Sequence, residues 1–380
     1  MVRPGPPVTL PMHLRDALKA LRHGGRWALS WVLARLIGTR RYATTLQPQA
    51  VSSVLICRLN GRIGNTMFLT PLIRQLHELL PHAVIDLAVG YPRATELLGS
   101  LPGVRRVITF PHRAPHKIWR YVAALRSMRA QRYSLAIDPI PESSSGHTLL
   151  SLARAEYRLG FASPNQWAPV THAVPVPPQI VHRALQPVFL VSEIFGAVYP
   201  PADLRLWLPL PQDELAAGRR LITEVIGQAI GPAGSTPASP VFGFFAHATH
   251  MKVVSQDWWR NFWAAFLQLE PQAVPLEFLP SRNSAPIDAH FASVHIPSTR
   301  ALTAAIAATR MFISPDAGPM HLASSTDVPT IGLFHVTDPA YFGPLKKSDH
   351  AIDIRRYSAL QTAQYCQRLW RAAGNQQPID

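Results

Sequence analysis

Short apolar runs alternate with longer amphipathic stretches along most of this chain, and that alternation restricts its fold more than any other feature. The strand-like runs of the first part are residues 54–57, 84–89, 104–110, 133–138 and 157–161. The helix-like stretches among them are residues 66–80, 93–100, 118–130 and 148–155. Strands that alternate with helices form a mostly parallel sheet covered on both faces.

The same alternation resumes after a proline-rich stretch at residues 198–212. Helices are expected at 213–227, 258–269, 299–309 and 319–325, and strands at 241–246, 276–279, 311–314 and 330–334. The chain is therefore predicted to be an α/β protein of two doubly wound, Rossmann-like domains that face a central cleft. The predicted parts are an extension (1–50), a first domain (51–197), the linker (198–212) and a second domain with a C-terminal helix (213–380).

The charge balance points to an anionic partner. Lys and Arg number 37 against 22 Asp and Glu, which gives a formal net charge of +15. Such a balance fits nucleic acid, a membrane surface or a phosphorylated substrate. Nucleic acid is not expected as a partner, because the chain has no RNP-type motif, zinc finger or recognition helix. The two cysteines, Cys57 and Cys366, are far apart and are expected to be structural, as in a reducing compartment.

The first 50 residues hold eight of the basic residues and one acidic residue. Leu, Trp and Val mix with spaced Arg and Lys at 12–37, which predicts an interfacial helix that binds an anionic membrane. A solvated helix packed on the first domain and an organelle transit peptide are the alternatives. A membrane span is not expected, because the apolar run at 27–38 is short and contains Arg35.

A glycine-rich loop follows the first strand-like run. Gly61, Arg62, Ile63, Gly64 and Asn65 stand between that run and a helix, where glycines let a ligand approach the backbone. The loop is neither a dinucleotide-binding fingerprint nor a P-loop. Its alternative interpretation is a tight strand-to-helix turn.

A second candidate site joins the strand at 311–314 to the next helix. Asp316 is expected to cap that helix, Gly318 permits close approach, and Pro319 suits a first turn. A phosphate would be favourable at this terminus, with His321 as a donor to a ligand oxygen. An ordinary capped helix with a packed histidine is the alternative.

A third candidate follows the strand at 241–246. The hydroxyl of Thr249 and the ammonium of Lys252 would both suit a diphosphate leaving group. His247 and His250 are interpreted as ordinary polar residues, because no carboxylate lies near them in sequence, and no metal site is predicted.

Two segments, residues 54–72 and 313–344, resemble glycosyltransferase family 9, the lipopolysaccharide heptosyltransferases, and the resemblance covers roughly residues 51–370. It implies the GT-B arrangement, a nucleoside diphosphate sugar as donor, usually ADP-heptose, and a lipid-linked saccharide acceptor. It also implies inversion at the anomeric centre without a metal or other cofactor. The implied location is the inner face of the cytoplasmic membrane, to which the enzyme binds peripherally.

The resemblance assigns roles to the candidate residues. Nucleotide-sugar contacts are implied for Asp316, Ala317, Gly318 and His321, and phosphate contacts for Thr249 and Lys252, the latter with a catalytic role. Gly61, Arg62 and Gly64 form the implied acceptor-side loop, and Asn65 occupies the position of the family's catalytic base.

Asn65 departs from the aspartate that the family usually has there. Because a neutral amide does not accept a proton at ordinary pH, Asp138 and Glu142 are substitute candidates for the base. The alternative is a catalytically silent nucleotide-binding or scaffold protein of the same fold. Two further departures, Ala317 for Thr and Val254-Ser255 for Trp-Pro, leave the nucleotide base and the sugar open.

Overall fold

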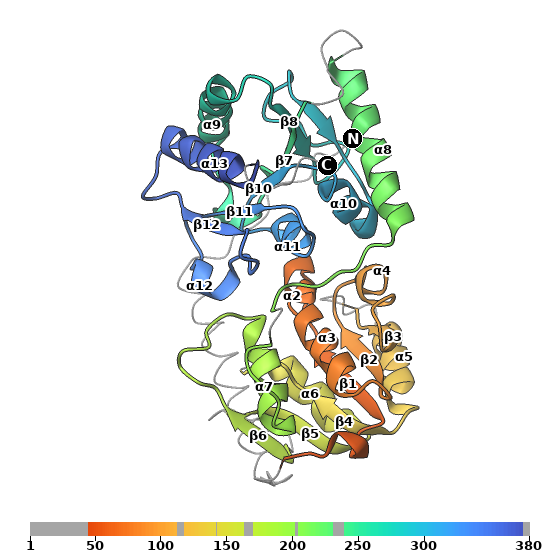
Figure 1. Ribbon diagram of the computed structural model, residues 1–380. Helices are drawn as coiled ribbons and strands as arrows, with labels where there is room; N and C mark the ends of the chain where they lie inside the picture. Colours follow the sequence, from red (N-terminus) through yellow and green to blue (C-terminus); the bar gives the residue numbers. More distant parts are fainter. Residues whose placement is uncertain are drawn as a thin grey trace, which may run out of the picture.

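The computed structural model describes residues 45–111, 118–141, 143–162, 170–201, 204–230 and 239–374. These residues form two halves, each built on a six-stranded sheet in which every pairing is parallel (Figure 1). The predicted α/β fold of two doubly wound domains is confirmed. Residues 1–44, most of the predicted N-terminal extension, lie outside the described residues. Within the described ranges, no helix has the length and apolar character needed to cross a membrane.

The first sheet has the strand order β3-β2-β1-β4-β5-β6. Its strands are β1 (Ser53–Arg58), β2 (Val84–Val89), β3 (Val104–Thr109), β4 (Tyr133–Ile137), β5 (Ala155–Ala162) and β6 (His172–Pro175). The order reverses between β1 and β4, and ligands of such sheets bind beyond the carboxyl ends of the strands at that point. The glycine-rich loop after β1 is therefore placed at this crevice.

The second sheet repeats that order, as β12-β11-β10-β7-β8-β9. Its strands are β7 (Val241–Phe244), β8 (Val274–Phe278), β9 (Ala292–Val294), β10 (Met311–Pro315), β11 (Thr330–Phe334) and β12 (His350–Asp353). Here the order reverses between β7 and β10, so the segments that carry Lys252 and Asp316 both leave the sheet at the crevice.

The predicted helix at 66–80 is in fact two helices. The helices of the first half are α2 (Ile63–Met67), α3 (Thr70–Leu79), α4 (Ala94–Leu98), α5 (Ile118–Arg129), α6 (Ser144–Leu152) and α7 (Leu185–Phe195). Pro71 lies in the first turn of α3 and has no N–H to donate to the Met67 carbonyl. The Thr70 hydroxyl donates to that carbonyl instead, at 2.7 Å, so the chain restarts its helix here.

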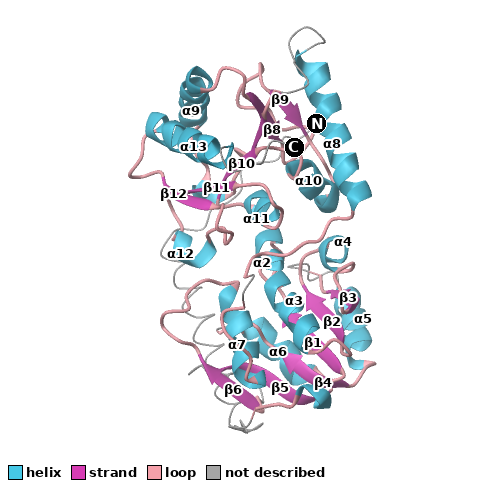
Figure 2. Cartoon of the chain, viewed as in Figure 1, coloured by secondary structure: helices cyan, strands magenta, loops and turns pink. Residues whose placement is uncertain are grey.

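The second sheet is covered on both faces (Figure 2). Its helices are α8 (Gln212–Ile230), α9 (Gln256–Leu269), α10 (Thr299–Ile306), α11 (Gly318–Ser324), α12 (Pro339–Phe342) and α13 (Ala359–Gly374). Helices α9 and α13 lie on one side of the sheet and α8 and α10 on the other. Trp259 and Trp263 of α9 are fully buried against Phe244 of β7, which anchors α9 to the sheet.

Both cysteines are free and fully buried, as expected for structural residues. Burial raises the pKa of the Cys366 thiol to about 12. Neither thiol is therefore exposed or ionised at neutral pH.

The two halves are fastened on two flanks. On one flank, the Arg300 guanidinium of α10 lies 2.7 Å from the Glu214 carboxylate and donates to Ser100 Oγ at 2.8 Å. It also donates to the Pro209 carbonyl at 2.9 Å, and the Arg300 amide donates to Glu96 at 3.1 Å. This flank joins α4, the connecting chain, α8 and α10 through charged groups.

The other flank is largely uncharged. His182 Nε2 donates to the Gly343 carbonyl at 2.9 Å, while its Nδ1 accepts from the Ala184 amide at 3.2 Å. Phe68 packs edge-on against His182, with ring centroids 5.5 Å apart. Burial lowers the pKa of His182 to about 4, with the positive charge of His321 adding to the effect, so His182 is neutral in the folded protein at neutral pH.

Candidate active site between the two sheets

A cleft of about 790 Å³ lies between the halves, at the crevices of both sheets. Nine of the predicted site residues line it: Arg62, Gly64, Asn65, Thr249, Lys252, Asp316, Ala317, Gly318 and His321. Gly61 and Asp138 are not among its lining residues, and Glu142 lies outside the described residues. Three segments that are far apart in sequence are thus brought to one cavity.

The two halves touch closely through α2 and α11. A Cβ added at Gly64 would lie 2.4 Å from His321 Cδ2, and one at Gly318 would lie 1.9 Å from Ile63 Cγ2. Both distances are shorter than van der Waals contact, so α2 and α11 could not pack this closely if either glycine were replaced by a larger residue. The two glycines therefore set the spacing between the walls of the cleft.

Asp316 binds a cluster of donors in the second half. Lys252 Nζ and the Thr337 hydroxyl both donate to Asp316 Oδ2, the latter at 2.7 Å, and His321 Nε2 lies 3.6 Å from Oδ1. Burial alone would raise the pKa of Asp316, but the hydrogen bonds from His321, Lys252 and Thr337 together hold it well below its ordinary value. Asp316 is thus a permanent anion that fixes the ammonium of Lys252 at the cleft.

The expectation that Asp316 caps α11 is wrong. The N-cap position is Ala317, and no side chain accepts a hydrogen bond there. The carboxylate of Asp316 turns to Lys252 instead, because an ammonium offers a stronger, charge-assisted hydrogen bond than a backbone amide.

The segment at 337–343 forms part of the cleft beside Asp316 and Lys252, a role that its sequence alone does not indicate. Thr337 contacts Asp316, the Asp338 carboxylate caps α12 by accepting from the Ala340 amide at 2.8 Å, and Pro339 occupies the first turn. The ring centroid of Phe342, in α12, lies 5.8 Å from Lys252 Nζ. The motif thus holds one side of the cleft around the lysine.

Asn65 is oriented by Arg58. Arg58 ends β1, is almost completely buried, and donates from Nη2 to Asn65 Oδ1 at 3.1 Å. Burial lowers the pKa of Arg58 to about 10, although the nearby Asp138 opposes that effect. With its oxygen held by Arg58, the Asn65 amide has its two N–H groups free to donate into the cleft.

Asp138 lies beneath the cleft wall. It is 1% exposed, accepts from the Ile140 amide at 3.2 Å, and lies 3.6 Å from His147 Nε2. A Cβ at Gly146 would come within 2.4 Å of its carboxylate oxygens, so the protein closes over this group. Burial raises the pKa of Asp138 well above its ordinary value. This geometry does not support direct proton abstraction from a ligand in the cleft.

One pair in the cleft was missed by the sequence reasoning. His247, interpreted as an ordinary polar residue, lines the cleft and places Nε2 3.0 Å from the Glu277 carboxylate. Glu277 on β8 is fully buried and also accepts from the Ile287 amide at 2.8 Å. A carboxylate in the middle of an apolar strand was the signal that could have pointed to this pair.

No group of three or more His, Cys, Asp or Glu side chains arranged to hold a metal ion occurs among the residues that the structure describes.

Comparison with known proteins supports the family resemblance. The model of glycosyltransferase family 9 (heptosyltransferase) matches residues 298–369, which include α10, α11 and the 337–343 segment. Lipopolysaccharide core heptosyltransferase OpsX of Haemophilus influenzae is 21% identical over 322 residues, covering 82% of this chain and 87% of OpsX. The match confirms the predicted resemblance to glycosyltransferase family 9. It also supports the predicted glycosyltransferase activity.

Solved structures agree on the fold of this chain. The glycosyltransferase family 9 protein of Veillonella parvula superposes with a TM-score of 0.69 at 15% identity, over 86% of this chain and 99% of that one. The E. coli heptosyltransferase WaaC with ADP gives a TM-score of 0.64 at 17% identity, over 83% and 99%. The GT-B arrangement is thereby established for this chain.

Proposed function

We propose that this family 9 enzyme transfers a heptose from ADP-heptose to a lipid-linked saccharide of the lipopolysaccharide core, with inversion at the anomeric carbon. The names of its relatives support the substrate class: OpsX is a lipopolysaccharide core heptosyltransferase, and WaaC is a heptosyltransferase solved with ADP and with ADP-2-deoxy-2-fluoro heptose. The observation that carries the proposal is the Lys252 ammonium, fixed by Asp316 in a cleft whose opposite wall presents Asn65.

The donor side needs positive charge at the leaving group. As the bond between the anomeric carbon and the diphosphate breaks, negative charge develops on the diphosphate oxygen. Lys252 lies where it can stabilise that charge, and Thr249 lines the same cavity. In this proposal the protein supplies the stabilisation with its own cation and needs no metal or other cofactor.

The acceptor side needs an oriented hydroxyl. Its oxygen attacks the anomeric carbon from the face opposite the diphosphate, and its proton passes to a base. The Asn65 amide, held by Arg58, would donate to that oxygen and fix its position without taking the proton. Asp138 is buried beneath the cleft wall, so it remains a candidate for the base only if an intervening group passes the proton to it.

The test pairs binding with turnover in the full chain. We expect ADP and ADP-heptose, but not UDP or GDP species, to raise the melting temperature, with about 2.7 kcal/mol of stabilisation at 100 times the dissociation constant. Lys252→Ala should weaken that shift and abolish transfer, whereas Lys347→Ala, an exposed lysine of the same half, should change neither. A selective UDP or GDP response would change the donor, and no response to any nucleotide would overturn the proposal.

The comparisons do not favour the alternative of a catalytically silent scaffold protein. In this proposal the enzyme works at the inner face of the cytoplasmic membrane, where its lipid-linked acceptor is found. The N-terminal extension as a membrane contact stays a prediction, since residues 1–44 lie outside the described part.

A further inference from the structure

Helix α5 begins with two large apolar side chains in solvent. Trp119 is 78% exposed and Ile118 is 56% exposed. The opposite side of the helix, with Ala124 and Met128, is buried against the first sheet. At 100° per residue, Trp119 and Arg126 share the direction that points away from that buried side. We call Ile118, Trp119, Ala123 and Arg126 the α5 outer face; all four are exposed.

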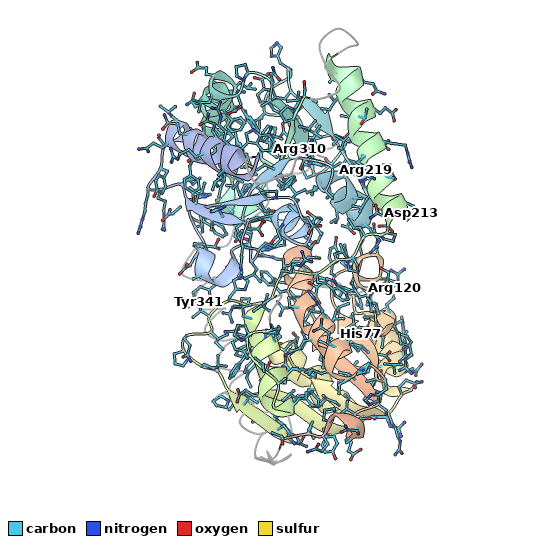
Figure 3. The ribbon with its side chains drawn as sticks, in the orientation of Figure 1. His77, Arg120, Asp213, Arg219, Arg310 and Tyr341 are labelled. Carbon is cyan, nitrogen blue, oxygen red and sulfur yellow. The ribbon has the colours of Figure 1, made fainter. Side chains whose placement is uncertain are left out.

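The sequence around this face has only basic charged residues, although two of them, Arg105 and Arg106, are paired with Asp86 of β2. Residues 97–137 contain eight Lys and Arg and no Asp or Glu. Within α5, Arg129 donates to the Leu152 carbonyl at 2.8 Å, a neutral partner that leaves its charge uncompensated. Figure 3 labels Arg120 in the same first turn as Trp119, on the outer flank of the first half.

A comparable helix in the second half is built differently. Leu360 in the first turn of α13 is 52% exposed, but one arginine before this helix and one in its last turn are paired with carboxylates. Arg355 lies 2.7 Å from Asp353, and Arg371 lies 2.6 Å from Glu270. An exposed apolar residue on a helix is therefore not by itself distinctive, whereas exposed tryptophan in an acid-free basic segment is.

We propose that the α5 outer face docks on the surface of an anionic lipid bilayer. An indole ring is most stable at the boundary between headgroups and acyl chains, where its apolar body is buried and its N–H stays hydrated. Arginine side chains extend their charge to lipid phosphates, and each basic residue near an anionic leaflet strengthens binding. The exposed first turn of α5 fits such a surface.

The position of α5 gives this contact a consequence. A helix that connects parallel strands runs antiparallel to them, so the first turn of α5 lies at the carboxyl ends of the first sheet, where the cleft also opens. Docking through Trp119 would hold that end of the first half toward the bilayer.

The test places a reporter on the face in the full chain. Trp119→Cys is labelled with an environment-sensitive fluorophore, since Cys57 and Cys366 are 0% exposed and will not react. We expect its fluorescence to rise with vesicles of phosphatidylethanolamine and phosphatidylglycerol and not with vesicles of phosphatidylcholine. The same label at Leu360→Cys should report no change with either.

A charge variant measures the electrostatic part. Arg126→Gln in the labelled protein should weaken binding to the anionic vesicles about five-fold. Sedimentation with the vesicles of the unlabelled chain and of its Arg126→Glu variant, which should bind less, guards against an effect of the label on folding. The proposal is overturned if the chain sediments with vesicles while the Trp119→Cys signal stays constant, if neutral vesicles give the same rise, or if no vesicle binds.

Discussion

Asn65 and Arg58 decide what the acceptor side of the cleft can do. Because Arg58 occupies Asn65 Oδ1, a carboxylate at this position would pair with the guanidinium and could no longer donate a hydrogen bond to the acceptor. We expect Asn65→Ala and Asn65→Asp each to lower kcat about ten-fold, while the thermal shift with ADP is retained. Steady-state kinetics with ADP-heptose measure this. A large gain in turnover for Asn65→Asp would instead favour a decayed active site that lacks its base.

Glu277 is a buried, hydrogen-bonded carboxyl group whose removal should be costly. Glu277→Leu leaves the Ile287 amide and His247 without their acceptor, and we expect a loss of about 1–3 kcal/mol in the free energy of unfolding. Urea unfolding measures the loss. Glu224→Leu, on the exposed side of α8, is the matched control and should stay within about 0.5 kcal/mol of the parent. Equal losses in the two variants would mean that the His247 pair contributes nothing particular.

Sequence reasoning found the site residues that directly follow central strands, and it found few others. The loops that carry Asn65, Lys252 and Asp316 leave β1, β7 and β10, so the parallel-sheet rule placed them together. Arg183 and Thr337 reach the same cleft through packing between distant segments, which no local pattern encodes. Asp138 follows a strand as well, but its carboxylate turned inward to His147.

At the scale of elements, the approach of α2 to α11 depends on the absence of side-chain atoms. Gly318→Ala would place a methyl group into Ile63, so we expect it to separate the two helices and to destabilise the protein by about 1–3 kcal/mol. Urea unfolding and the ADP-induced thermal shift should both report the change. The double variant Gly318→Ala with Ile63→Ala removes the colliding methyl group and should recover most of the loss; a purely additive result would refute this account.

The elements themselves were predictable where they are central and long. The strands β1, β2, β4, β7 and β10 are nearly continuous buried apolar runs, which the sequence displays directly. β6, β9 and β12 were not predicted, because each is an edge strand of three or four residues and is only partly buried. The break between α2 and α3 was missed because a proline in a first turn is also compatible with a continuous pattern.

The whole molecule should respond to acid through His182. Its folded pKa of about 4 lies below the ordinary value near 6.5, so the folded state binds fewer protons than the unfolded chain between these values. The contribution of neutral His182 to the free energy of unfolding is fully present above about pH 6.5. It is lost as the pH falls toward 4, by about 2 kcal/mol at pH 5. We expect His182→Gln, whose amide can still donate to Gly343, to lose less on going from pH 7 to pH 5 in urea unfolding. An identical loss in both proteins would contradict the assignment.

The two flanks that fasten the halves differ in chemistry. On one flank the Glu96 carboxylate accepts from the Arg300 amide. On the other, His182 donates to the Gly343 carbonyl and Phe68 packs against His321 and Phe342. Salt weakens the charged contact more than the neutral one, whereas acid near the His182 pKa of about 4 protonates the imidazole of the second contact. The two edges of the cleft are therefore held by contacts of different chemistry, so salt and acid act on opposite edges of the protein.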